Sequence, residues 1–200
     1  MKRAAPYDRD TALDAAVALF WEKGYRATSL KDLEAALQMK PGSIYAAFTS
    51  KEALFLTALE RYVDQARREF RQVIDEADSP LEGLCAYLRR IGKGENGGSE
   101  CRACLLIKTI LDVAPSEGAI ADRSRQHLDQ LKAEFAAEFE RAKALGELAP
   151  DADCGQLALR YQLNIQALRI ESHRGSNQAE RSTLAESMVR DLRELRPGPD

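Results

Sequence analysis

The sequence lacks a long hydrophobic run and any recognisable catalytic cluster. No stretch approaches the roughly 18 consecutive apolar residues that a membrane-spanning helix needs. The first residues lack the apolar core of a signal peptide, so we expect a cytoplasmic protein without a membrane partner. The two histidines belong to no recognisable serine or cysteine triad, which argues against an enzyme.

Cysteines and glycines are present, but not in patterns typical of a disulfide framework or a nucleotide site. The four cysteines are expected to be thiols, because a reducing compartment disfavours disulfides. The glycine-rich segment GENGG follows no strand and has no Walker lysine, so it predicts a loop. We therefore expect no cofactor.

Charge is distributed unevenly along the chain, although the net charge is only −3. Residues 1–51 carry eight Lys or Arg against six Asp or Glu, a net charge of +2, so residues 52–200 carry −5. The positive N-terminal segment has the sign expected of a module that meets an anionic partner.

Helical spacing of apolar residues predicts two helices at the start of the chain. The first lies between Asp8 or Asp10, which can cap its start, and Gly24, which can end it. The second is short and runs from a cap at Thr28 or Ser29 to residues 38–39. These two helices are the first part of a predicted N-terminal head.

A third short helix and a long fourth helix follow. Pro41 fits the first position of the third helix, and Thr49 with Ser50 interrupts it. Ser50 is then positioned to cap a long helix whose apolar positions continue through Ile74 toward Asp78.

The remainder of the chain also has helical periodicity, and no credible strand alternation is found. Five further helices are predicted at about 81–92, 103–114, 117–145, 152–173 and 178–195. The sequence therefore predicts an all-α fold of about nine helices, with a three-helix head at residues 1–50 and a helical-bundle body at 51–200. The long helix after Ser50 connects them.

The segment from Leu30 to Leu54 raises the question of why a helix too short to be stable alone in water lies between two others. Two short helices joined by a tight turn form a helix-turn-helix unit, whose second helix can enter a DNA major groove. We expect three larger side chains of that helix to face at least partly inward: Ile44, Tyr45 and Phe48. Small residues then face outward: Gly42, Ser43, Ala46 and Ala47.

Several polar and basic side chains border this helix and can contact phosphates. They are Thr28, Ser29, Lys31, Lys40, Tyr45 and Lys51. From the pattern alone, a compact helical corner without DNA-binding function is the alternative interpretation.

The stretch ALFWEKGYRATSLKDLEAALQMKPGSIYAAFTSKEALFLTAL resembles the DNA-binding head of the TetR family of bacterial transcriptional repressors. The resemblance rests on the aromatic-Gly-Tyr-x-x-Thr-Ser run, the Gly-Ser-Ile-Tyr-x-x-Phe helix and the Ser-Lys-Glu-x-Leu restart, and it is strong over residues 8–60. It implies a homodimer that binds a palindromic operator on double-stranded DNA and is released by a small effector, with the fourth helix as a lever.

The same resemblance implies particular contact residues. The positions that match DNA contacts in the family are Thr28, Ser29, Lys31, Lys40, Gly42, Ser43, Tyr45, Ala46, Ala47 and Lys51. Ala46 and Ala47 can make only apolar base contacts, such as with a thymine methyl group. A helical small-molecule carrier or an enzyme without specific DNA binding is the alternative function.

In the family the last two helices pair with their copies. Here they carry two apolar stripes, Leu157, Tyr161, Ile165 and Leu168 on one and Leu184, Met188, Leu192 and Leu195 on the other. We expect these stripes to form the dimer face, with closure of the monomer's own core as the alternative.

The segment ECRACLLIKT resembles the start of the sixth helix in a family subgroup of electrophile-sensing and oxidant-sensing repressors. Cys104 matches the reactive cysteine, and Lys108, one turn further, is able to lower a thiol pKa. Ala103 and Lys108 depart from the subgroup's pattern. A buried cysteine that only packs at a helix start is the alternative role of Cys104.

Polar residues on otherwise apolar helical stretches are further candidates for contact with the effector. They are Tyr87, His127, Tyr161 and Gln162, each of which can equally be a satisfied core group. Cys101 and Cys104 also admit a metal pair or a redox switch, but further ligands at close spacing are missing, so we expect no metal site.

Overall fold

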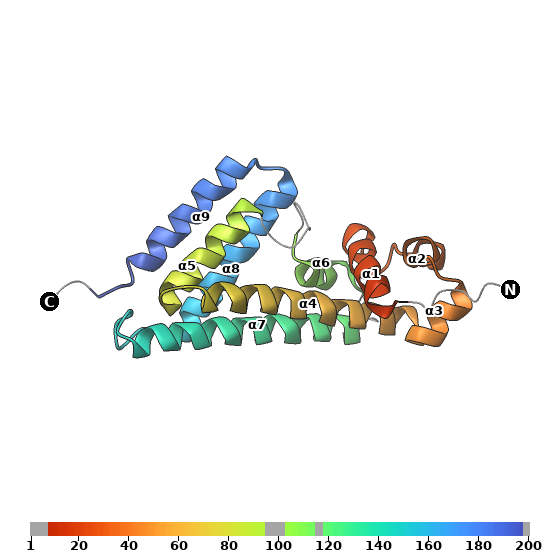
Figure 1. Ribbon diagram of the computed structural model, residues 1–200, viewed down its shortest axis with the longest axis horizontal. Helices are drawn as coiled ribbons and strands as arrows, with labels where there is room; N and C mark the ends of the chain where they lie inside the picture. The colour runs from red at the N-terminus through yellow and green to blue at the C-terminus, as the bar shows by residue number, and fades with distance from the viewer. Residues whose placement is uncertain (1–7, 95–102, 115–117, 198–200) are drawn as a thin grey trace. The chain divides into compact units, whose positions relative to one another are not determined.

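The structure is a computed structural model that describes residues 8–94, 103–114 and 118–197 (Figure 1). Every regular element in these ranges is an α-helix. The helices are α1 (Arg9–Lys23), α2 (Leu30–Leu37), α3 (Pro41–Phe48), α4 (Lys51–Asp75), α5 (Pro80–Lys93), α6 (Leu105–Asp112), α7 (Gly118–Ala144), α8 (Cys154–Arg174) and α9 (Gln178–Arg193). The predicted all-α fold is confirmed.

The predicted helix ends are confirmed by capping contacts. The Asp8 carboxylate accepts a hydrogen bond from the Asp10 amide at 3.0 Å, and the Gly24 amide donates to the Phe20 carbonyl at 2.8 Å. The Ser50 hydroxyl accepts from the Ala53 amide at the start of α4. Other ends differ by two or three residues: α4 ends at Asp75 instead of continuing toward residue 78, α6 spans Leu105–Asp112 instead of 103–114, and α9 ends at Arg193 instead of 195.

The chain divides into two compact units. The head unit comprises Met1–Gln65 and Leu105–His127, and the body unit comprises Ala66–Cys104 and Leu128–Asp200. Helices α4 and α7 each contribute residues to both units. No described helix has the length and apolarity required to cross a bilayer.

Aromatic rings form the centre of the head unit. Phe20 of α1 meets Phe55 of α4 edge to face, with ring centroids 4.8 Å apart. Trp21 contacts Tyr62 in the same way, with centroids 5.3 Å apart. Such pairs add directional stabilisation to the burial of apolar area. They seat α1 against the first half of α4.

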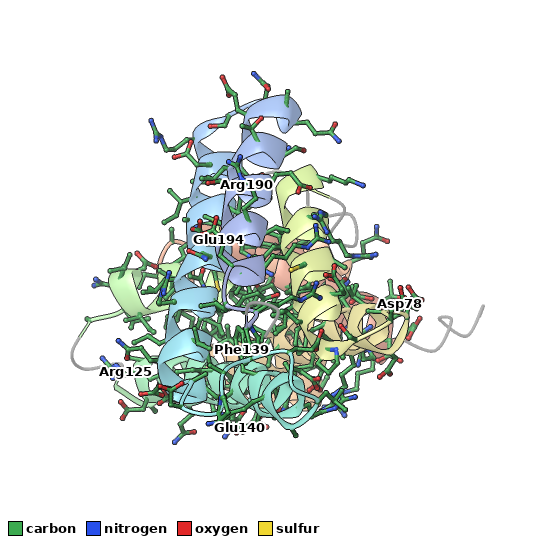
Figure 2. All side chains as sticks on the ribbon, turned by 90° about the vertical axis from the view of Figure 1, so that its left-hand side faces the viewer. Asp78, Arg125, Phe139, Glu140, Arg190 and Glu194 are labelled. Atoms are coloured by element: carbon green, nitrogen blue, oxygen red, sulfur yellow. The ribbon has the colours of Figure 1, made fainter. Side chains whose placement is uncertain are left out.

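The body unit has its own core, built from α4, α5, α7, α8 and α9. Phe139 of α7 is fully buried, whereas its neighbour Glu140 is exposed on the outer side of the same helix (Figure 2). Helices α5 and α9 approach closely at Gly92, where an added Cβ atom would lie 2.6 Å from the Ala185 Cβ. Glycine at this position therefore permits the crossing of the two helices.

The apolar stripes predicted to form the dimer face belong instead to this core, so that prediction is wrong. The residues Leu157, Tyr161, Ile165, Leu168, Met188 and Leu192 are all buried within the body unit, and Leu184 and Leu195 pack against them. The α8 stripe closes the monomer core because Tyr161 packs against Phe135 of α7 and donates to the Leu84 carbonyl of α5.

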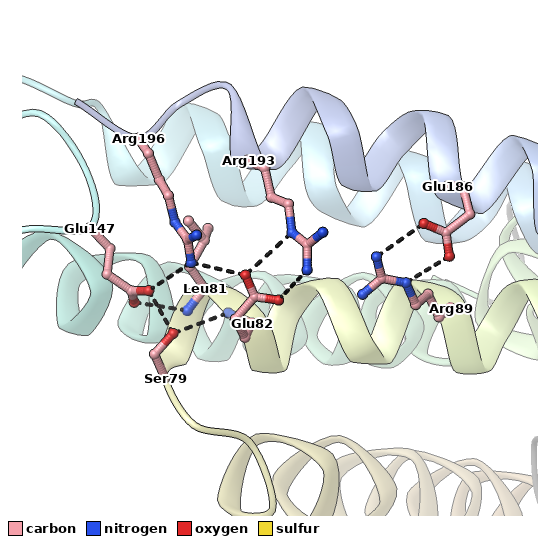
Figure 3. Close-up of polar contacts among 8 residues, drawn as sticks. All are labelled: Ser79, Leu81, Glu82, Arg89, Glu147, Glu186, Arg193 and Arg196. Atoms are coloured by element: carbon pink, nitrogen blue, oxygen red, sulfur yellow. Dashed lines mark hydrogen bonds and ion pairs between the residues drawn. The ribbon is translucent and has the colours of Figure 1, made fainter. Parts of the chain in front are cut away.

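Polar contacts add a second layer of attachment between α5 and α9 (Figure 3). Arg193 donates to the Glu82 carboxylate at 2.6 Å, and Arg89 donates to Glu186 at 2.6 and 3.0 Å. The hydrogen bond from Arg193 is the main reason that the pKa of Glu82 lies below its ordinary value. These contacts fix the rotation of α9 on the core.

Candidate DNA-binding surface and effector region

Helix α3 presents small residues and one tyrosine at the surface of the head unit. Ile44 and Phe48 are only 1% and 4% exposed, so they anchor the inner side of the helix. Tyr45 keeps 45% of its surface exposed. The outward positions predicted from the sequence are exposed at Gly42, Ser43 and Ala46 and half-buried at Ala47. Small side chains at these positions leave the α3 backbone accessible to close approach.

The N-terminus of α2 is organised by a capping box. The Ser29 hydroxyl accepts from the Asp32 amide at 3.2 Å, while the Asp32 carboxylate accepts from the Ser29 amide at 2.8 Å. Lys23, the last residue of α1, forms an ion pair with the other Asp32 oxygen. The pKa of Asp32 lies well below its ordinary value. The hydrogen bond from Lys23 is the largest cause, and the hydrogen bonds from Ser29 come next. Ser29 and Lys31 are both exposed beside this helix start.

Thr28 was predicted to contact phosphate, which requires an exposed side chain, but its side chain is buried. Its side chain is 1% exposed, and its hydroxyl donates to the Gly24 carbonyl at 2.6 Å. The sequence pattern therefore identified a residue that shapes the turn between α1 and α2. The exposed side chains at this end of α2 are those of Ser29 and Lys31.

Two cationic side chains of the head unit lie over aromatic rings. Lys51 Nζ lies 4.6 Å from the centroid of the Tyr25 ring, and Arg9 Cζ lies 5.7 Å from that of Phe48. Arg9 was not identified from the sequence, because its stacking partner is far away in the chain. Lys40 is exposed directly before α3. Positive charge therefore lies at both ends of α3.

The body unit brings two effector candidates, Tyr87 and Tyr161, into one aromatic cluster. Tyr87 contacts Phe70, with centroids 5.1 Å apart, and Phe135 joins Phe70 to Tyr161, with both centroid distances at 5.0 Å. Burial raises the pKa of both tyrosines. The Tyr161 hydroxyl donates to the Leu84 carbonyl at 2.8 Å. Tyr161 is thus a satisfied core group, which the sequence had left open.

Gln162 is also partnered within the body unit, since its side-chain amide donates to the Leu128 carbonyl at 2.8 Å. In the head unit, His127 of α7 is only 6% exposed. The remaining candidate, Lys108 of α6, donates from its ammonium group to the carbonyls of Trp21 and Glu22 at 2.7 and 3.0 Å. Lys108 thus binds the end of α1.

The described cysteines are all buried. Cys104 is 4% exposed and directly precedes α6. Burial raises the pKa of Cys85 to about 11 and also raises the pKa of Cys154, which makes both thiols poor nucleophiles. Cys101 lies outside the described residues, so the predicted pair with Cys104 does too. Among the described residues, no three His, Cys, Asp or Glu side chains are grouped to hold a metal ion.

Helix α8 carries a second apolar stripe on the side away from the body core. Leu159, Leu163 and Ile170 expose 42%, 59% and 50% of their surfaces. They recur at intervals of four and seven residues, so they lie along one face of the helix. The sequence pattern does not separate this stripe from the buried one, because both have helical spacing.

An exposed, well-anchored helix-turn-helix on an all-helical chain defines the class of helical DNA-binding regulators. Two family models match the chain, "Bacterial regulatory proteins, tetR family" over residues 12–58 and "Tetracyclin repressor-like, C-terminal domain" over residues 80–184. The chain belongs to the TetR family.

Relatives with known names cover almost the whole chain. It is 31% identical to the HTH-type transcriptional repressor ComR of Escherichia coli (strain K12), over 96% of this chain and 92% of ComR. It is 33% identical to a cysteine mutant of the TetR family regulator CifR complexed with 26-base-pair operator DNA, with a TM-score of 0.85 over 94% of this chain and 98% of that one. Reduced E. coli NemR shares the fold, with a TM-score of 0.73 and 16% identity over 96% of this chain and 97% of NemR. ComR and CifR are transcriptional regulators and not enzymes.

Proposed function

We propose that this protein is a transcriptional repressor that binds a palindromic operator as a homodimer and is released by a small effector. The observation that carries the proposal is the exposed face of α3, which is small at Gly42, Ser43 and Ala46 and is anchored from below by Ile44 and Phe48. A helix of this kind can enter the major groove with its backbone close to the base edges. The operator complex of CifR supports the same use of the head.

The flanking groups fix the head on the phosphate backbone. Lys40 and Lys51 lie on either side of α3, Tyr45 is exposed on α3 itself, and Ser29 and Lys31 lie at the start of α2. Amide groups at helix N-termini favour anions, so Ser29 and the first residues of α3 add to the lysine charges. Such contacts set position and affinity, whereas Ala46 and Ala47 contribute apolar base contacts.

The exposed stripe of α8 is the proposed dimer face. Leu159, Leu163 and Ile170 are large apolar residues left uncovered by their own chain, and a second copy would bury them. A two-fold dimer presents two copies of α3 to the two halves of a palindrome. Dimerisation through this face is therefore required for binding both half-sites.

The effector acts on the body under this proposal. Residues 1–50 form the DNA-binding domain and residues 51–200 the effector-binding and dimerisation domain, with α4 as the lever between them. Two effector classes are considered, a reagent that reacts covalently at Cys104 and an apolar or aromatic molecule that binds reversibly. The raised thiol pKa values of Cys85 and Cys154 argue against either as the reactive residue. Regulation of this kind takes place in the cytoplasm.

Fluorescence anisotropy on a duplex covering the protein's own upstream region tests the proposal. We expect tight binding that falls steeply with salt and far exceeds binding to a scrambled duplex. Tyr45→Ala and Lys51→Ala should each weaken it, while Lys132→Ala, which removes a half-buried lysine of α7 in the body unit, should not. Binding that is equal on both duplexes would favour the carrier or enzyme alternative.

The effector class is tested by adding a thiol electrophile to the bound complex. Release of wild type but not of Cys104→Ser would identify a covalent sensor at Cys104. If both stay bound, Cys104 is a packing residue and the effector binds reversibly.

A further inference from the structure

The C-terminus of α1 is capped by a residue from a distant helix. The Phe20 carbonyl accepts from the Gly24 amide at 2.8 Å, and the carbonyls of Trp21 and Glu22 follow it at the end of the helix. Lys108 of α6 donates to these carbonyls, at 2.7 Å to Trp21 and 3.0 Å to Glu22. A cation at this end also interacts favourably with the helix dipole. One ammonium group therefore caps two carbonyls at the C-terminus of α1.

Helix α6 approaches the same end of α1 at a second point. Gly24 has a φ of +81°, and an added Cβ atom would lie 2.9 Å from the Asp112 carboxylate. Asp112 follows Lys108 by one helical turn, so both face the end of α1. The Gly24 carbonyl also accepts a hydrogen bond from the Thr28 hydroxyl. The turn that leads from α1 into α2 is thus contacted by α6 on one side and is stabilised by the hydrogen bond from Thr28, a residue of the turn itself.

The contacts continue from the end of α1 to the start of α2. Lys23 lies directly after the two carbonyls that Lys108 binds, and its ammonium group pairs with Asp32. Asp32 in turn closes the capping box with Ser29. A continuous set of polar contacts therefore joins α6 to the helix start that carries Ser29 and Lys31. All of these residues belong to the head unit.

We infer that Lys108 is a positioning residue for operator binding, which sets the placement of α2 through the end of α1. The inference rests on the proposed function. Loss of the ammonium group would remove two charge-assisted hydrogen bonds from the end of α1. Loss of these contacts should weaken operator binding through loss of alignment at Ser29 and Lys31.

Three variants of the full-length protein test the inference on the upstream duplex. Lys108→Met keeps the side-chain length but removes the donors, and Lys108→Arg keeps a cation able to donate to both carbonyls. Lys143→Met is the matched control, because Lys143 donates to the Ala152 carbonyl at 3.0 Å in the body unit. We expect Lys108→Met to weaken operator binding about tenfold, the scale of one charge-assisted hydrogen bond. Lys108→Arg should restore binding, and Lys143→Met should leave it unchanged.

Amide hydrogen exchange separates positioning from general stability. Lys108→Met should speed exchange at the end of α1 and in the first turn of α2, and leave α5, α8 and α9 as in wild type. Wild-type affinity of Lys108→Met, or equal acceleration of exchange in both units, would overturn the inference. If the wild-type protein itself does not prefer the upstream duplex over a scrambled one, the proposed function fails instead, and the exchange experiment still reports whether Lys108 holds α1 and α2.

Discussion

Replacement of Leu163 by glutamine should dissociate the proposed dimer. Leu163 exposes 59% of its surface at the middle of the uncovered α8 stripe, between Leu159 and Ile170. Glutamine is similar in size, so the change removes apolar contact without opening a large gap. It also places an amide where a second chain offers no assured hydrogen-bond partner, which adds a desolvation cost.

The size of the effect follows from the exposed fraction. Complete burial of a leucine side chain contributes about 2 kcal/mol. Covering the exposed 59% of Leu163 therefore contributes about 1.2 kcal/mol in each protomer and about 2.4 kcal/mol in a symmetric dimer. The dimer dissociation constant should rise roughly 50-fold, since about 1.4 kcal/mol corresponds to a factor of ten.

Sedimentation equilibrium over a range of protein concentrations measures this constant. Leu145→Gln is the matched control, because Leu145 is 67% exposed but lies just after α7 and outside the α8 stripe. It should leave the dimer unchanged. A dissociation constant for Leu163→Gln within about threefold of wild type, less than 1 kcal/mol by the same conversion, would refute the assignment of this face.

Three further predictions concern helix capping, helix crossing and pH. Ser29→Ala removes the α2 cap and should lower the free energy of unfolding by about 1 kcal/mol in a urea titration. Gly92→Ala forces a Cβ atom to within 2.6 Å of the Ala185 Cβ and should cost about 1 to 3 kcal/mol in the same assay, whereas an unchanged midpoint would contradict the close crossing of α5 and α9. The Arg193 contact lowers the folded-state pKa of Glu82, so its stabilisation is present above the unfolded pKa of about 4.3 and is lost as pH falls below it. Glu82→Gln should therefore lose less stability than wild type between about pH 5 and pH 3 in thermal unfolding scans, and an equal loss would contradict this role.

The helices were predictable because their signals are local. Asp8, Ser29 and Ser50 each accept a hydrogen bond from a backbone amide within three residues. Pro41 begins α3 because its fixed φ suits the first helical position. The inner side of α3 followed in the same way from the three-residue and four-residue spacing of apolar positions. Local patterns therefore supplied most of the fold and the face of α3.

Contacts between distant segments could not be predicted from these patterns. Lys108 stands one turn from Cys104, so the sequence suggested that the two act together, whereas the ammonium group binds the end of α1. Helix α8 has apolar residues on two sides, and only packing shows which side the body core covers. Thr28 has the composition of a surface cap, but its hydroxyl turns inward to Gly24.

Under the proposed function, the head binds DNA through α3. The most direct measurement is the affinity of the purified protein for a palindromic duplex from its own upstream region, compared with a scrambled duplex of equal length at two salt concentrations. We expect specific binding at least about a thousandfold tighter than binding to the scrambled duplex, and a strong loss of that preference in Tyr45→Ala. Equal affinity for both duplexes, or a Tyr45→Ala variant that binds as wild type, would contradict it.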